Sequence, residues 1–142
     1  MLKLSENQKY ILIRLLKDLA LQDRNFDGLE AIRIRTIGLK MDMAMAKIDE
    51  AFYEDFQTVE QILDSLGRFE TAEQKNFVYQ QCASLLMSDR KISSEEQSTL
   101  EQLRQALAIG EEKHRQILTW VQEGMEWEKR GEELAGGSLE DS

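Results

Sequence analysis

The chain has 142 residues with no proline, 8 glycines and 1 cysteine; 42% of its residues are hydrophobic and 32% are charged. This mixture is typical of a globular domain with a core, and excludes a disordered or fibrous chain. The net charge of -9 argues against a nonspecific nucleic-acid binder, which usually has a basic face. The single cysteine excludes an internal disulfide and a Cys-rich zinc site.

The same composition predicts where the protein works. No stretch approaches the roughly 18 uninterrupted apolar residues of a membrane span. The richest, residues 10–21, is interrupted by Arg14, Lys17 and Asp18, and the first residues lack the order of a secretory signal. We therefore expect a cytoplasmic protein that is not an integral membrane protein and does not bind nucleic acid.

Apolar residues recur at helical spacings in seven successive segments, and no segment alternates apolar and polar residues long enough to predict a strand. The absence of proline also favours helices joined by short turns. In chain order the apolar stripes are Ile11, Leu12, Leu15, Leu16 and Leu19; Ile34, Ile37 and Met41; Met45, Ile48 and Phe52; Val59, Ile62, Leu63 and Leu66; Val78, Cys82, Leu85 and Leu86; Leu100, Leu103 and Leu107; and His114, Ile117, Leu118 and Val121.

Five capping boxes mark helix starts, each a Ser, Thr or Asp followed three residues later by Gln or Glu. They are Ser5 with Gln8, Asp27 with Glu30, Thr58 with Gln61, Thr71 with Gln74, and Ser93 with Glu96. The boxes and the apolar residues repeat at a constant offset, since Thr71 matches Ser5 and Ser93 matches Asp27. The sequence therefore predicts an all-α, single-domain bundle of about seven helices, built from two pseudo-symmetric halves.

The predicted domain covers residues 1–127. Its halves span about 5–57 and 71–125, and a short helix over 58–67 joins them. The charged and glycine-containing segment 128–142 has little to bury, which predicts a flexible acidic tail.

The turn after the first helix of each half resembles the TerB-like family, named for tellurite resistance. In that family a helix ends in Ala-Asp-Gly, and the next helix opens after a hydrophobic residue, a Ser or Thr, and a Glu. Asp23, Phe26, Asp27 and Glu30 match one copy, and Asp89, Ile92, Ser93 and Glu96 match the other. The family's glycine is replaced by Arg24 and Arg90. The resemblance covers roughly residues 5 to 125.

The resemblance implies an all-helical, cytoplasmic module that is not an enzyme and that is associated with tellurite and other stress responses. It also implies that acidic residues of the two turns bind a divalent cation such as calcium. Together with the carboxylate of Asp27, the candidate ligands are Asp23, Asp27, Glu30, Asp89 and Glu96. The alternative is that these residues only cap helices and shape turns.

Other candidate sites in the sequence have weaker support. Asp23-x-Asn25-x-Asp27-Gly28 matches the opening of an EF-hand, but Ile34 stands where the bidentate Glu should close the loop. His114 is the only histidine, so it lacks partners for the usual zinc sites, and Cys82 lies in an apolar stripe that predicts a buried thiol.

A second functional interpretation comes from methionines and aromatic residues. Met41 and Met45 lie on the predicted core stripe, whereas Met43 is expected to point elsewhere. Trp120 and Trp127 share a face if the last helix continues, which predicts a contact surface for an unknown protein partner or for a homodimer. The alternative function is therefore a metal-free helical scaffold or adaptor with an exposed Met/aromatic patch.

Overall fold

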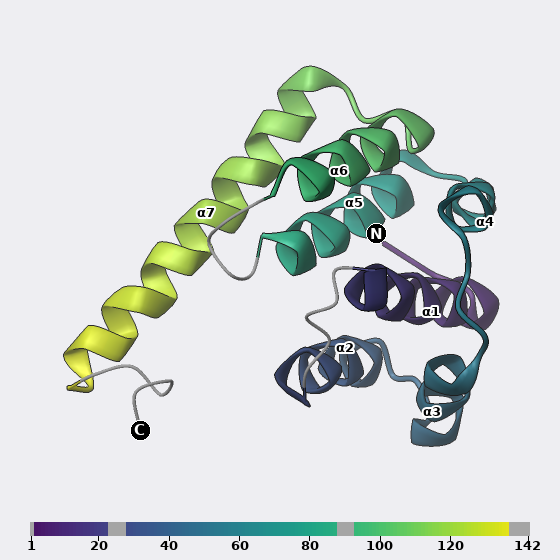
Figure 1. Cartoon of the computed structure of the whole chain (residues 1–142), viewed down its shortest axis with the longest axis horizontal. Helices are drawn as coiled ribbons and strands as arrows, with labels where there is room; N and C mark the ends of the chain where they lie inside the picture. The colour runs from purple at the N-terminus through teal and green to yellow at the C-terminus, as the bar shows by residue number, and fades with distance from the viewer. Residues whose placement is uncertain (1, 23–27, 88–92, 137–142) are drawn as a thin grey trace.

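The structure is a computed structural model that describes residues 2–22, 28–87 and 93–136. Within these ranges it contains seven α-helices, one short 3-10 helix and no strand, which confirms the predicted all-α class. In chain order the elements are α1 (Glu6–Gln22), α2 (Gly28–Lys40), α3 (Met45–Tyr53), α4 (Val59–Ser65), the 3-10 helix η1 (Leu66–Arg68), α5 (Ala72–Leu86), α6 (Ser94–Ala106) and α7 (Glu111–Leu134), as Figure 1 shows.

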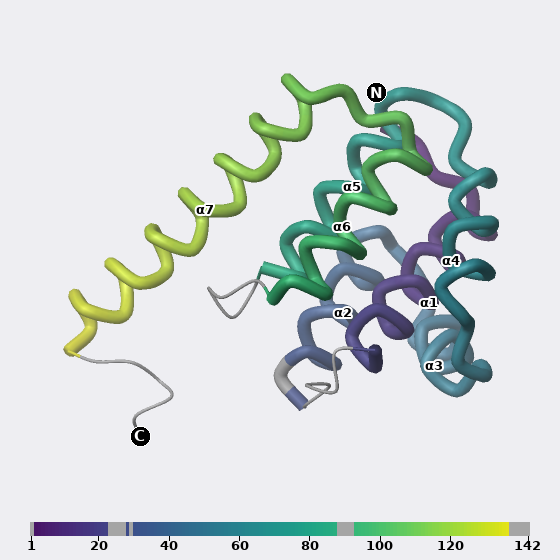
Figure 2. The backbone as a smooth tube through the Cα atoms, turned by 45° about the horizontal axis from the view of Figure 1, so that its top comes forward, coloured from purple at the N-terminus to yellow at the C-terminus, as the bar shows by residue number. Residues whose placement is uncertain are grey.

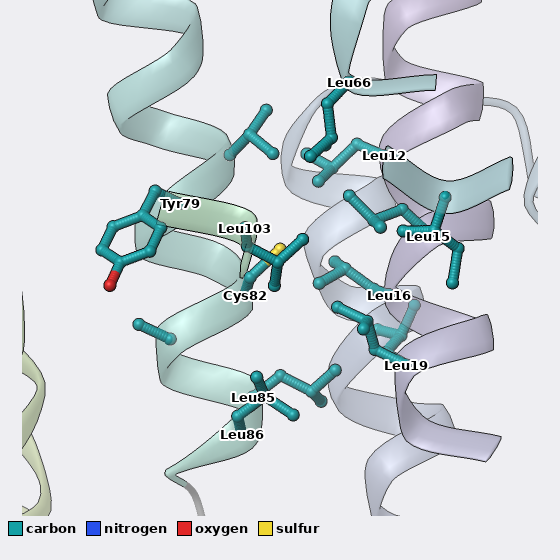
Figure 3. Packing of buried hydrophobic residues seen from close by; sticks show 14 of the residues in the cluster. Leu12, Leu15, Leu16, Leu19, Leu66, Tyr79, Cys82, Leu85, Leu86 and Leu103 are labelled. Atoms are coloured by element: carbon teal, nitrogen blue, oxygen red, sulfur yellow. The ribbon is translucent and has the colours of Figure 1, made fainter. Parts of the chain in front are cut away.

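The core is centred on the contact between α1 and α5. Helices α2 and α3 pack against α1, and α6 and α7 pack against α5. Figure 3 shows the leucines of α1 facing Cys82 and Leu85 of α5. Leu12, Leu16 and Cys82 are completely buried, because the apolar stripe of each helix faces the other across the centre of the molecule.

Four of the five predicted capping boxes form. Ser5 and Gln8, Thr58 and Gln61, Thr71 and Gln74, and Ser93 and Glu96 exchange side-chain and backbone hydrogen bonds in both directions. Asp27 lies outside the described residues. These boxes begin their helices where the sequence predicts, because a side-chain oxygen accepts from an amide that has no partner within the helix.

Three pairs of helices begin at the offset that the sequence repeat predicts. The starting residues are Glu6 and Ala72, Gly28 and Ser94, and Met45 and Glu111. The only positive-φ residues other than glycine in the described part of the chain are Asp42 (φ 61°) and Ala108 (φ 54°), which end α2 and α6. Where α1 meets α5, the Gln8 and Gln74 side chains, 66 residues apart, donate to each other at 3.2 and 3.3 Å.

Met43 shows that one prediction was wrong. The residue expected to point away from the core is buried, whereas Met45, placed on the core stripe, is 47% exposed. The reason is the turn that ends α2: Asp42 adopts a left-handed conformation, and the amide of Met43 bonds back to the carbonyl of Gly38 at 3.1 Å. This Schellman geometry folds the residue after the turn back onto the helix that it ends.

A buried ion pair holds the segment that follows α3. Lys17 and Asp18 of α1 are 2% and 0% exposed, and the Lys17 Nζ lies 2.9 Å from the Asp18 Oδ1. Lys17 also donates to the carbonyl of Glu54 at 2.7 Å, and Asp18 Oδ2 accepts from the amide of Gln57 at 3.3 Å. The pair therefore fixes the connection between α3 and α4 against α1.

The last helix is longer than the sequence analysis predicts. Helix α7 runs to Leu134, so residues 128–134, assigned to the tail, are helical. Its counterpart α3 ends at Tyr53 after 9 residues, against 24 residues in α7. Figures 1 and 2 show the carboxyl-terminal half of α7 extending beyond the other helices.

Replacing Lys17 with Met tests the buried pair. The change leaves the Asp18 carboxylate buried without its cation, so we expect the free energy of unfolding to fall by about 3–5 kcal/mol. Lys47→Met, in an exposed pair with Glu50 at 3.1 Å, should cost less than about 1 kcal/mol. The measurement is urea unfolding of both variants at pH 7. Equal losses of unfolding free energy would show that the buried pair matters no more to the fold than the exposed pair does.

The same variant has an expected pH dependence. Burial raises the pKa of Asp18 above its ordinary value despite the neighbouring ammonium. A raised pKa in the folded state means that folding favours the protonated carboxyl, so the ionised form lowers stability as pH rises through that pKa. Lys17 opposes this rise in wild type, so its loss raises the pKa of Asp18 further, and the stability deficit of Lys17→Met relative to wild type should shrink as pH falls from 7 toward 5.

Candidate functional site

The structure describes two of the five predicted cation ligands. Glu30 lies in the first turn of α2, and Glu96 lies in the first turn of α6. Asp23, Asp27 and Asp89 lie outside the described residues. Among the residues that the structure describes, no group of three or more His, Cys, Asp or Glu side chains is placed to hold a metal ion.

Glu96 has an unusual environment for a carboxylate. Its side chain is 7% exposed, its Oε1 accepts from the amide of Ser93 at 3.0 Å, and the Ser93 Oγ accepts from the amide of Glu96 at 3.1 Å. Its Oε2 is buried and has no hydrogen-bond partner among the residues that the structure describes. A buried carboxylate oxygen without a donor is costly, so this position favours any cation or donor that reaches it.

A hollow lies beside this carboxylate. It has a volume of about 230 Å³ and is bounded by the end of α1, the end of α5 and the first turns of α6; its lining residues are Leu19, Gln22, Leu86, Glu95, Glu96 and Thr99. The two turns that carry the other predicted ligands follow Gln22 and Met87 in the chain. The space therefore lies beside the carboxyl-terminal ends of α1 and α5.

Cys82 and His114 lie on different sides of α5. The Cys82 thiol is completely buried, and this burial raises its pKa to about 12, so it is protonated at neutral pH. The His114 Nδ1 lies 2.6 Å from the hydroxyl of Tyr79, a hydrogen bond that joins α7 to α5. Burial raises the pKa of Tyr79 well above its ordinary value, so this phenol stays protonated at neutral pH.

Three large apolar side chains are exposed along one face of α7. Trp120 is 51% exposed, Trp127 is 72% exposed and Leu134 is 89% exposed. They are seven residues apart, which is nearly two helical turns, so they lie on the same face. Ile117 and Val121 are buried, so the exposed face, called here the Trp face (Trp120, Trp127, Leu134), borders the core at Trp120 and extends beyond it at Trp127 and Leu134.

The sequence analysis did not predict a larger groove that the structure contains. It has a volume of about 580 Å³, within the range of small-molecule sites, and combines apolar side chains with three lysines. Its lining comes from the first residues, α1, the end of α2, α5 and α7: Leu2, Lys3, Leu4, Lys9, Ile37, Lys40, Met41, Asp42, Phe77, Gln81 and Trp120. Its residues come from five segments, so no local pattern could have indicated it.

Comparison of the chain with family models, with curated proteins and with solved structures yields no match. Among the described helices, none is both long enough and apolar enough to cross a lipid bilayer.

The environment of Cys82 predicts how its thiol reacts. Because the sulfur is buried and its pKa is about 12, a disulfide reagent at pH 8 should modify no thiol in the folded protein and one thiol per chain in guanidinium chloride. The measurement is the absorbance of the released thiolate. Rapid labelling of the folded chain would show that the α1–α5 core opens readily.

Proposed function

We propose that the chain is a non-enzymatic, cytoplasmic helical binding module of the TerB-like type, and that it binds a divalent cation at its acidic turns in a stress response related to tellurite resistance. The observation that carries the cation site is the buried Oε2 of Glu96, which has no hydrogen-bond partner within the described part of the chain, in a residue that lines a hollow. Hard cations such as calcium bind several oxygens, and carboxylates are their usual ligands in proteins.

The two-fold pattern supports this reading. Matching helix starts, the paired left-handed residues Asp42 and Ala108, and the reciprocal bonds of Gln8 and Gln74 favour two halves with a common origin. In such an arrangement the turn after α1 and the turn after α5 are equivalent, and Glu30 corresponds to Glu96. We infer that the cation is shared by these two turns, with Asp23, Asp27 and Asp89 as its other ligands.

Calorimetric titration with calcium, magnesium and zinc tests the site. The wild-type chain should release or absorb heat, and its melting temperature should rise, at or below millimolar ion. Glu96→Gln should lose both effects but keep its fold, because Gln61 and Gln74 form the same capping box with an amide. Glu112→Gln, in the first turn of α7, is the matched control and should bind as wild type does.

No heat and no thermal shift with any of the three ions would eliminate the cation site. Binding that is unchanged in Glu96→Gln would place the ion elsewhere.

A second function is favoured by the Trp face. Its exposed indoles are the side chains that dominate protein contacts, and they lie on a helix that extends beyond the bundle. We propose that the chain acts as a scaffold or adaptor through this face, whether or not it binds a cation.

Trp127→Ala separates a contact surface from a structural role. Because Trp127 is 72% exposed, its loss should change the free energy of unfolding by less than about 0.5 kcal/mol, whereas a tryptophan closing a core would cost about 3–5 kcal/mol. The measurement is urea unfolding at submicromolar chain concentration, where association contributes little. A loss of several kcal/mol would remove the Trp face as a binding surface.

A further inference from the structure

Two glycines interrupt the Trp face at regular places. Gly124 lies between Trp120 and Trp127, and Gly131 lies between Trp127 and Leu134. The spacings along the face are four, three, four and three residues, which is the pattern of a coiled-coil seam. Large and small residues therefore alternate along one line of α7.

Nothing within the described chain requires these glycines. A Cβ atom built at Gly124 or at Gly131 meets no heavy atom within 4 Å, and neither residue has a positive φ. Each glycine costs a helix interior about 1 kcal/mol relative to alanine. The glycines have a steric purpose only if another surface approaches the helix closely at these two positions.

We infer that the Trp face binds a second copy of this chain, α7 against α7 and antiparallel, with each tryptophan over a glycine of its mate. In one register, Trp127 packs over Gly124 of the second copy and Trp120 packs over Gly131 of the second copy. The two-fold axis repeats both contacts. This inference rests on the scaffold function proposed above and names its partner; it is independent of the cation site.

A parallel arrangement of the two α7 helices would pack the same residues less well. It would stack tryptophan on tryptophan and leave facing glycines with nothing between them, which creates voids. Antiparallel pairing fills the space above each glycine with the largest side chain available.

The charges beside the seam agree with the antiparallel register. Glu123 and Arg130 flank the Trp face on the same side and are exposed. In the antiparallel register Glu123 faces Arg130 of the second copy, and symmetry makes this opposite-charge contact twice. Parallel pairing would instead bring Glu123 near Glu128, a like-charge contact.

The side of α7 also offers space for the end of the second helix. In this register Leu134 of the second copy reaches α7 near Ile117, where a hollow of about 230 Å³ is lined by Asn76, Gln80, Lys113, Gln116, Ile117 and Trp120. The most exposed apolar residue of the helix would then lie against Ile117 and Trp120.

Sedimentation equilibrium of the full-length chain and of charge-reversal variants tests the arrangement. Wild type should dimerise at micromolar concentration. Glu123→Arg and Arg130→Glu should each weaken the dimer about tenfold or more, because each creates two like-charge contacts. The double variant should recover most of the affinity, since it restores opposite charges across the axis.

Glu126→Arg is the matched control, because it reverses the same charge on α7 away from the Trp face and should dimerise as wild type does. A wild-type chain that stays monomeric at high micromolar concentration overturns the dimer. The unfolding free energy of Trp127→Ala then remains the test of the scaffold function. If Glu123→Arg strengthens the dimer, the two α7 helices are parallel. If Glu123→Arg and Glu126→Arg weaken the dimer equally, the contact between the two copies does not use the Trp face. Either result overturns the proposed register.

Discussion

The buried contact between Lys17 and Asp18 fixes the path of the chain after α3. Two adjacent charges on α1 are withdrawn from water and bond to the backbone at Glu54 and Gln57. An ion pair of this kind adds little net stability over apolar residues of similar volume, because removing both charges from water is costly. Its effect is to favour one path of the chain, since only the turn after α3 supplies the carbonyl and the amide that the pair needs.

Among the described residues of α5, α6 and α7, no buried ion pair of this kind is found. The positions that correspond to Lys17 and Asp18 are Ala83 and Ser84, and α7 continues where α3 stops. Helix α7 runs on to Leu134, beyond the other helices, with Trp127 exposed. The two surfaces of most functional interest thus differ in setting: the hollow at Glu96 lies among α1, α5 and α6, and the Trp face lies on the part of α7 that extends beyond the other helices.

Local patterns in the sequence predicted the helices well, because each start depends on a few neighbouring residues. Ser93 and Glu96 form their capping box with atoms three residues apart, and no distant contact is needed. Met43 was misplaced because its burial depends on a left-handed residue at Asp42, which helical periodicity does not reveal. The burial of Glu96 and the groove beside Phe77 depend on how α1, α5, α6 and α7 pack, and spacing along the chain does not determine that packing.

The bonds between Gln8 and Gln74 couple two helix starts that lie far apart in the chain. Each amide group donates to the other and accepts from it, and the two residues occupy corresponding places in their helices. A contact of this type is one that two identical polypeptides could make across a symmetry axis. Within one chain, the two amides instead tie the first turn of α1 to the first turn of α5, so a change at either glutamine removes hydrogen bonds from both helices at once.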